Sequence, residues 1–169
     1  MNTPDGAGTR AAPDPAAAAV PDPAHRTVSV AAVVAHGAAD GHRVEIRAGR
    51  HLLTSDGLPC EGGSDAGPSP FGLLLCALGA CTVMTLRTYA GRHDVALDEI
   101  RVRLVYETDG APGGDGDAAG AVARVRRRIT LFGDLDDARR ARLLEVAERT
   151  PVTLAVRAGI RIDTDEERA

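Results

Sequence analysis

The sequence of 169 residues contains no tryptophan and no lysine, and aromatic side chains make up only 2% of it. A hydrophobic core must therefore be built from Leu, Val, Ile and Ala. Such a core buries little apolar surface per residue, and pairing with a second subunit would add to the stability of the chain. All 20 basic residues are arginines, and a formal net charge of -4 provides no general attraction for polyanions. We therefore expect neither nucleic acid nor an anionic membrane as a partner.

Motifs for metal ions and for nucleotide phosphates are also missing. The three cysteines and five histidines show no C-x-x-C or H-x-x-x-H spacing. No G-x-x-x-x-G-K-[ST] is present, and no G-x-G-x-x-G opens a helix, so we expect no metal and no cofactor. The odd number of cysteines, and a start MNTPDGAG without a basic region or apolar run, predict a reducing, cytoplasmic location.

The most distinctive stretch that is present is an apolar helix, expected at residues 70–89. Ser69 followed by Pro70 is a helix-start signature, because the serine oxygen can cap a backbone N–H and proline has none to cap. Residues 71–84 carry no charge, so we expect protein to cover this helix all round. A membrane span is the competing interpretation. It fails on length, because the uncharged run is shorter than the roughly 18 to 20 residues that cross a bilayer, and Arg87 follows closely.

Alternating apolar and polar residues predict short strands on both sides of this central core helix. The segment RVEIR at 43–47 places Val44 and Ile46 on one face and three charges on the other, and RVRLVYE at 101–107 alternates in the same way. A Gly/Asp-rich connection at 109–120 lets the next strand pair back as a long hairpin. The predicted strands span residues 27–35, 43–47, 51–55, 101–107, 121–131 and 160–162.

A second helix is expected after the hairpin. Asp134, with Asp137 three residues on, resembles a capping box, and Pro151 ends or breaks the helix. The order of strands, core helix, hairpin, helix and strand predicts an α+β domain with a largely antiparallel sheet packed on the central helix. The predicted parts are a disordered Ala/Pro-rich tail, the domain itself and a charged tail, at residues 1–26, 27–165 and 166–169.

The three cysteines have different surroundings. A free cysteine on an apolar helix is more often a packing residue than a nucleophile, and Cys76 fits that interpretation. Cys76 and Cys81 lie about 140° apart around the predicted helix, too far for a disulfide without unwinding it. Cys60, in the glycine-rich loop at 56–67, has the mobility to approach a helix residue.

The arginine run RVRRR at 124–128 raises the question of RNA binding. Most of these arginines share one parity of the predicted strand. Because the chain is acidic and poor in aromatics, a solvated sheet face is the favoured interpretation.

The pattern GPSP…LGAC…LR-x-YA at 67–90, followed by RVRLVYE and by RRITLFGDLDD…TPVTLAV, resembles the OsmC/Ohr family of thiol-dependent peroxidases. The resemblance covers residues 27–165. It implies an OsmC-like fold and an intertwined homodimer, in which a central helix carries a reactive cysteine at the subunit interface. By this resemblance Cys81 matches the cysteine that attacks an organic hydroperoxide, which would place the protein in oxidative-stress defence.

The sequence departs from this family pattern at two functional positions. Gly72 stands where members of this subtype usually have a glutamate, and Thr150 stands where a CPV-H segment usually supplies the resolving cysteine. His51 is kept from the segment before the helix. The resemblance also implies an arginine that holds the thiolate, and the N-terminal strands offer three candidates, Arg43, Arg47 and Arg50.

Two hypotheses follow from the match and its departures. In the first, Cys81 attacks an organic hydroperoxide, and an external thiol or Cys60 resolves the sulfenic acid that forms. In the second, the chain keeps the dimeric fold and binds a small apolar ligand or a partner without peroxidase chemistry.

Overall fold

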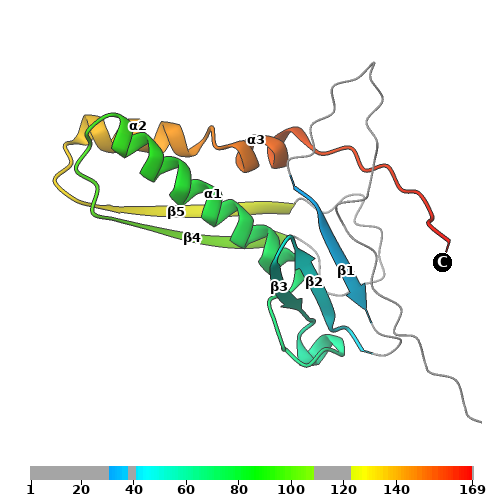
Figure 1. Ribbon diagram of the computed structural model, residues 1–169. Coiled ribbons are helices and arrows are strands. Elements are labelled where there is room, and N and C mark those ends of the chain that lie inside the picture. The colour runs from blue at the N-terminus through cyan, green and yellow to red at the C-terminus, as the bar shows by residue number, and fades with distance from the viewer. Residues whose placement is uncertain (1–30, 38–40, 109–122, 169) are drawn as a thin grey trace, which may run out of the picture. The chain divides into compact units, whose positions relative to one another are not determined.

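The computed structural model describes residues 31–37, 41–108 and 123–168, which form two compact units divided between Pro68 and Ser69 (Figure 1). The fold is α+β with antiparallel strands, as the sequence predicts. The strands form two sheets, one in each unit. The predicted tail at 1–26 and the connection at 109–120 lie outside the described residues, and the predicted domain limits stay a prediction.

The first unit holds an antiparallel sheet of order β1-β2-β3, formed by Val33–Gly37, Val44–Ala48 and His51–Ser55. Ala48 pairs with His51, so a two-residue turn joins β2 and β3. Gly49 opens this turn at φ 58°, a left-handed conformation that glycine adopts without steric cost. The predictions of β2 and β3 are confirmed. Strand β1 extends to Gly37, beyond the end predicted at residue 35, and its predicted beginning at 27–30 lies outside the described residues.

A buried carboxylate organises the loop that follows β3. Asp56 is 3% exposed. It accepts hydrogen bonds from the Ser64 hydroxyl at 2.6 Å, the Ser64 N–H at 2.9 Å, the Ala66 N–H at 3.1 Å and the Gly57 N–H at 2.8 Å. The Ser64 hydroxyl, followed by the Ala66 N–H, lowers the pKa of Asp56 to about 2. The loop folds so tightly that a Cβ on Gly63 would lie 2.0 Å from the Gly57 carbonyl oxygen. Ionised Asp56 therefore holds the backbone of this loop in place.

The second unit is built around α1, the helix Pro70–Arg92 (Figure 1). It begins at the predicted residue, with the Gly72 N–H donating to Ser69 Oγ at 3.2 Å. Its buried residues recur every fourth position and form one stripe: Leu78, Thr82, Leu86 and Ala90. Elsewhere on α1 the side chains reach solvent, and Met84 is 69% exposed. The prediction that protein covers this helix all round is therefore wrong for the single chain.

A long antiparallel hairpin packs on α1, formed by β4 (Glu99–Thr108) and β5 (Ala123–Phe132). The predicted inward face of β4 is confirmed, because Val102, Leu104 and Tyr106 are half-buried, whereas Arg101, Arg103 and Val105 are exposed. A Cβ on Gly79 would lie 3.1 Å from Leu104 Cδ1, so glycine allows the helix to approach the strand closely. Near the start of α1, Phe71 stacks on Tyr106 with ring centroids 4.3 Å apart.

Two shorter helices complete the second unit, α2 (Asp137–Ala147) and α3 (Pro151–Ala158). The predicted break at Pro151 is confirmed, because α3 begins there. The capping prediction is wrong by two residues. Asp136, and not Asp134, has the extended backbone of a capping residue, and its Oδ1 accepts from the Arg139 N–H at 2.7 Å.

The predicted last strand at 160–162 is absent from the structure. Residues 159–168 form neither helix nor strand, and Ile160 and Ile162 are 68% and 82% exposed. An alternating pattern becomes a strand only when another strand supplies hydrogen-bond partners, and no described strand pairs with this segment.

Helix α1 is long and apolar enough to cross a membrane by length and composition, with a mean hydropathy of 1.6. The prediction that it fails on length is therefore wrong. Instead, its contacts identify it as a core helix, because it packs against β4, α2 and α3 of the same unit.

The core of the second unit is aliphatic, as the scarcity of aromatics implies. Its fully or nearly fully buried members come from α1, the hairpin, the connecting segments and α2: Leu86, Ala90, Leu97, Leu131, Leu135, Leu143 and Ala147. Tyr89 packs against this cluster and is partly buried. The core therefore depends on leucine and alanine side chains.

The Asp56 contacts predict a specific dependence of stability on pH. Because the pKa of Asp56 falls from 3.8 to about 2 on folding, its stabilisation is full above about pH 4 and is lost as the pH falls toward 2. The free energy of unfolding of Asp56→Asn should lie below that of the wild type at pH 6, and this gap should shrink between pH 4 and 2. Chemical denaturation at a series of pH values measures it. Asp65→Asn, an exposed change in the same loop, should show no such trend. If the difference in the free energy of unfolding between the wild type and Asp56→Asn does not vary with pH, the lowered pKa of Asp56 is contradicted.

The core makes a second prediction. Leu143 is fully buried, and Leu144 beside it on α2 is 47% exposed. Leu143→Ala should lower the free energy of unfolding by about 2–5 kcal/mol, because it removes buried contacts and leaves a cavity. Leu144→Ala should change it by less than about 1 kcal/mol. Equal losses in urea denaturation would show that α2 does not pack as described.

Candidate functional site

Cys81 lies in the middle of α1, beside the buried Thr82, and is itself half-buried. It lines an open depression of about 620 Å³, to which α1 contributes most residues, Val146 comes from α2 and Pro151 begins α3. The nearest lining residues on α1 are small or apolar, among them Ala77 and Met84. This cysteine therefore faces a space that an apolar molecule could enter, whereas Cys76 is exposed on the same helix and does not line it.

The cations on α1 follow the Cys81 thiol at a distance along the helix. Arg87 follows it by six positions, or about 9 Å along the helix axis, and donates to the Leu97 and Asp98 carbonyl oxygens. Arg92, which also lines the depression, follows Cys81 by eleven positions, or about 16 Å. Among the described residues no charged side chain hydrogen-bonds to Cys81 or forms an ion pair with it. A group that stabilises a thiolate here would have to approach from another surface.

Gly72 leaves the first turn of α1 without a carboxylate. Its backbone N–H donates to the Ser69 hydroxyl, so the residue takes part in the helix cap. The departure recognised in the sequence is therefore compatible with the start of the helix, and it removes an acidic group from this end of α1.

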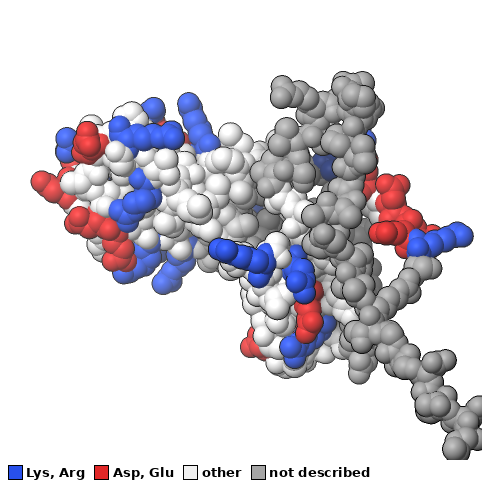
Figure 2. Space-filling model, in the orientation of Figure 1, with Lys and Arg blue, Asp and Glu red and all other residues white. Residues whose placement is uncertain are grey.

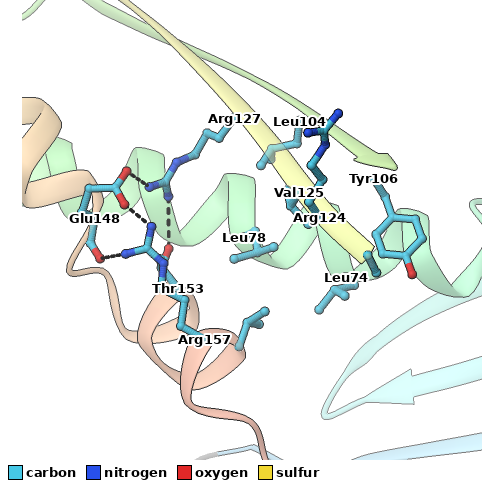
Figure 3. Close-up of a pocket in the computed structure, with 12 residues that line it drawn as sticks. Leu74, Leu78, Leu104, Tyr106, Arg124, Val125, Arg127, Glu148, Thr153 and Arg157 are labelled. Carbon is cyan, nitrogen blue, oxygen red and sulfur yellow. Dashed lines mark hydrogen bonds and ion pairs between the residues drawn. The ribbon is translucent and has the colours of Figure 1, made fainter. Parts of the chain in front are cut away.

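The Thr150 position carries a buried hydroxyl network. Thr150 is fully buried, and its Oγ1 lies 2.6 Å from Thr153 Oγ1. Arg127 Nη1 donates to Thr153 Oγ1 at 3.1 Å (Figure 3). The same nitrogen donates to Thr82 Oγ1, also at 3.1 Å. Thr82 in turn donates to the Leu78 carbonyl oxygen at 2.7 Å. Thr150 is therefore linked by hydrogen bonds, through Thr153 and Arg127, to the residue that follows Cys81.

The same guanidinium belongs to an ion-pair cluster. Arg127 Nη2 donates to Glu148 Oε1 at 2.8 Å, and Arg157 binds the other carboxylate oxygen of Glu148 (Figure 3). Partial burial raises the pKa of the Glu148 carboxyl, but hydrogen bonds and charge from Arg157 and Arg127 outweigh it, so the pKa lies below its ordinary value. Glu148 is therefore ionised at neutral pH and is shared by two cations.

Sequence reasoning missed Arg127 by treating the arginine run as one face. Arg124 and Arg126 point to the predicted solvated face and bind Glu107 Oε2 at 2.7 and 3.0 Å. Arg127 has the opposite parity on β5, and its side chain is only 12% exposed. Its opposite parity within the arginine run was the signal in the sequence that could have identified Arg127 as inward-facing. On the visible face of the second unit, basic and acidic side chains are interspersed (Figure 2).

The other predicted site residues belong to the first unit. His51 is exposed at the start of β3, and Cys60 is exposed in a short 3₁₀ helix, Pro59–Glu61. The three candidate arginines, Arg43, Arg47 and Arg50, are exposed on or beside β2. Cys81 lies in the second unit, so the roles assigned to these residues stay predictions.

Metal-ligating side chains do not gather in the described part of the chain. No group of three or more His, Cys, Asp or Glu residues there is placed to hold a metal ion.

Comparison with known proteins agrees with this fold. A family model described as OsmC-like protein matches residues 62–165. Comparison with curated protein sequences gives no match.

Solved structures resemble the chain closely in fold but weakly in sequence. An OsmC-like protein from Mycoplasma pneumoniae aligns over 78% of this chain and 89% of its own, with 16% identity and a TM-score of 0.64. An organic hydroperoxide resistance protein from Elizabethkingia anophelis aligns over 79% and 91%, with 18% identity and a TM-score of 0.60. An organic hydroperoxide resistance protein, OsmC, from Legionella pneumophila aligns over 78% and 92%, with 20% identity and a TM-score of 0.58. At these identities the likeness shows the fold.

The Arg127 network makes a testable prediction about stability. Arg127→Met would remove a buried guanidinium and leave the Thr82 and Thr153 hydroxyls without that partner. We expect the free energy of unfolding to fall by about 1–3 kcal/mol. Arg128→Met, on the exposed face of the same strand, should change it by less than about 0.5 kcal/mol. Urea denaturation distinguishes the two, and similar values for both variants would contradict the bridging role.

Proposed function

The chain belongs to the OsmC-like protein family, and on that premise we propose that it is a redox protein of oxidative-stress defence that reduces organic hydroperoxides through Cys81. The observation that carries this proposal is the half-buried Cys81, which opens onto an apolar depression of about 620 Å³. A space of this size accommodates a small apolar peroxide beside the sulfur. The neighbouring structures named as organic hydroperoxide resistance proteins support the same class of substrate.

The first step is nucleophilic substitution on the peroxide. The Cys81 thiolate attacks the terminal oxygen of ROOH, so that an S–O bond forms while the O–O bond breaks. The alkoxide that leaves takes a proton and departs as the alcohol ROH. Cys81 becomes a sulfenic acid, and the peroxide is reduced by two electrons.

The second step returns Cys81 to the thiol. An external thiol attacks the sulfenic sulfur, water leaves, and a mixed disulfide forms. A second thiol then attacks this disulfide and releases the Cys81 thiolate. The sum is ROOH + 2 RSH giving ROH, H₂O and RSSR. Thr150 has no sulfur to take part in these steps, and Cys60 is the candidate within the chain that would replace the first external thiol.

A homodimer fits this proposal. Helix α1 leaves apolar side chains such as Phe71 and Met84 more than half exposed, and a second copy would cover them. The family resemblance makes one of Arg43, Arg47 and Arg50 the candidate that stabilises the Cys81 thiolate, and His51 a further candidate. We place the protein in the cytoplasm, where thiol reductants are abundant.

Peroxide consumption tests the proposal directly. The purified chain should remove cumene hydroperoxide in the presence of dithiothreitol, followed as the loss of peroxide with time. Cys81→Ser should reduce the rate to the uncatalysed background, because serine does not form the thiolate nucleophile.

Matched cysteine variants give the controls. Cys76→Ser, on the same helix but outside the depression, should retain the wild-type rate. Cys60→Ser separates the two routes of resolution, because only an internal route loses rate when Cys60 is removed. No turnover by the wild type with any common thiol donor, together with equal alkylation of Cys76 and Cys81, would overturn the proposal.

A second function is favoured by the Thr150 network. The position of the resolving thiol is occupied by a hydroxyl that is itself hydrogen-bonded, so the chain is also compatible with a dimer that binds a small apolar ligand without chemistry. This alternative predicts no peroxide turnover, and binding of an apolar ligand that Cys81→Ser leaves unchanged.

A further inference from the structure

A second pocket lies within the second unit, between α1, the β4–β5 hairpin and α3. Its volume is about 440 Å³, which is within the range of sites that bind small molecules. Cys81 does not line it. The pocket is therefore distinct from the depression in which we place peroxide reduction.

The two ends of this pocket differ in polarity (Figure 3). At one end Arg127, Arg157 and Glu148 come together, with Thr153 beside them. Toward the other end the walls are mainly aliphatic and aromatic, with Arg124 beside them: Leu74, Leu78, Leu104, Val125 and Tyr106. A ligand that fits both ends would have a polar head and an apolar body.

The charge at the polar end of the pocket determines whether the polar head of a ligand should be anionic or cationic. Two guanidinium groups share the single carboxylate of Glu148, so the cluster carries excess positive charge. Arg124, which also lines the pocket, is bound to Glu107. The unbalanced charge therefore favours an anionic ligand and disfavours a cationic one.

Arg157 is the group able to accept a new partner. Its Nη1 donates to the Glu148 carbonyl oxygen at 3.3 Å, and its Nη2 donates to the Glu148 carboxylate. A guanidinium has five N–H donors, so others remain for a ligand. Its side chain is 59% exposed, which leaves it accessible, whereas Arg127 is largely enclosed by its hydroxyl partners.

We propose that this pocket binds a small amphipathic carboxylate. The carboxylate is held by Arg157, and an apolar body of about ten carbons lies along the Leu74, Leu78 and Leu104 wall. A fork of guanidinium donors matches two carboxylate oxygens, and the aliphatic wall gains from covering an alkyl chain. This site does not rest on the proposed peroxidase activity.

Calorimetric titration of the full chain with decanoate tests the proposal, with decanol as the uncharged analogue of the same length. Decanoate should bind more tightly than decanol, and more weakly as salt is added. Arg157→Gln should weaken decanoate binding by roughly five- to tenfold, the loss expected for one charge-assisted hydrogen bond at a partly exposed site, and leave decanol unchanged. Arg157→Lys keeps the charge but loses the guanidinium fork, so its affinity for decanoate should lie between those of the wild type and Arg157→Gln.

Arg92→Gln is the matched control, because Arg92 lines the depression beside Cys81 and not this pocket. It should leave decanoate binding as in the wild type. Loss of binding in Arg92→Gln but not in Arg157→Gln would place the ligand at the Cys81 depression and overturn the proposal. Absence of decanoate binding, or equal binding of decanoate and decanol, would overturn it as well. Peroxide turnover measured on the same Arg157→Gln protein reports separately on the proposed catalytic function.

Discussion

The guanidinium of Arg127 joins parts of the second unit that are far apart in the chain. It hydrogen-bonds to Thr82 on α1 and Thr153 on α3, and pairs with Glu148 just beyond α2. A largely buried cation has to find such partners, because its desolvation is costly. The hydrogen bonds that join α1, β5 and α3, and the polar end of the adjoining pocket, therefore depend on this one group.

The hydrogen bonds of Arg127 also explain the structural role of Thr150. Its hydroxyl contacts Thr153, which also bonds to Arg127, so the position is part of the packing between α1 and α3. Thr150 therefore contributes to the stability of the second unit through its hydroxyl. A bulky or apolar residue at position 150 would disturb the hydrogen bonds of α3 before it affected the thiol.

Local patterns predicted the elements well, because caps, breakers and alternation act within a few residues. The Ser69 cap of α1, strands β2 and β3 and the break at Pro151 all follow from neighbours in sequence. The predictions that failed concern features that depend on residues far apart in the sequence. The segment at 160–162 alternates but has no described strand beside it, and Arg127 gains its role from residues 26 and 45 positions away. The family resemblance located Cys81, but not the hydroxyl network beside it.

Helix α1 also affects how the chain reaches its working state. Its uncharged faces are covered along only one stripe, so a newly synthesised chain carries an extended apolar surface until another surface buries it. Such a surface promotes aggregation, and chaperones bind it in the cell. The yield of folded protein then depends on the competition between folding and irreversible aggregation, in addition to the stability of the folded chain.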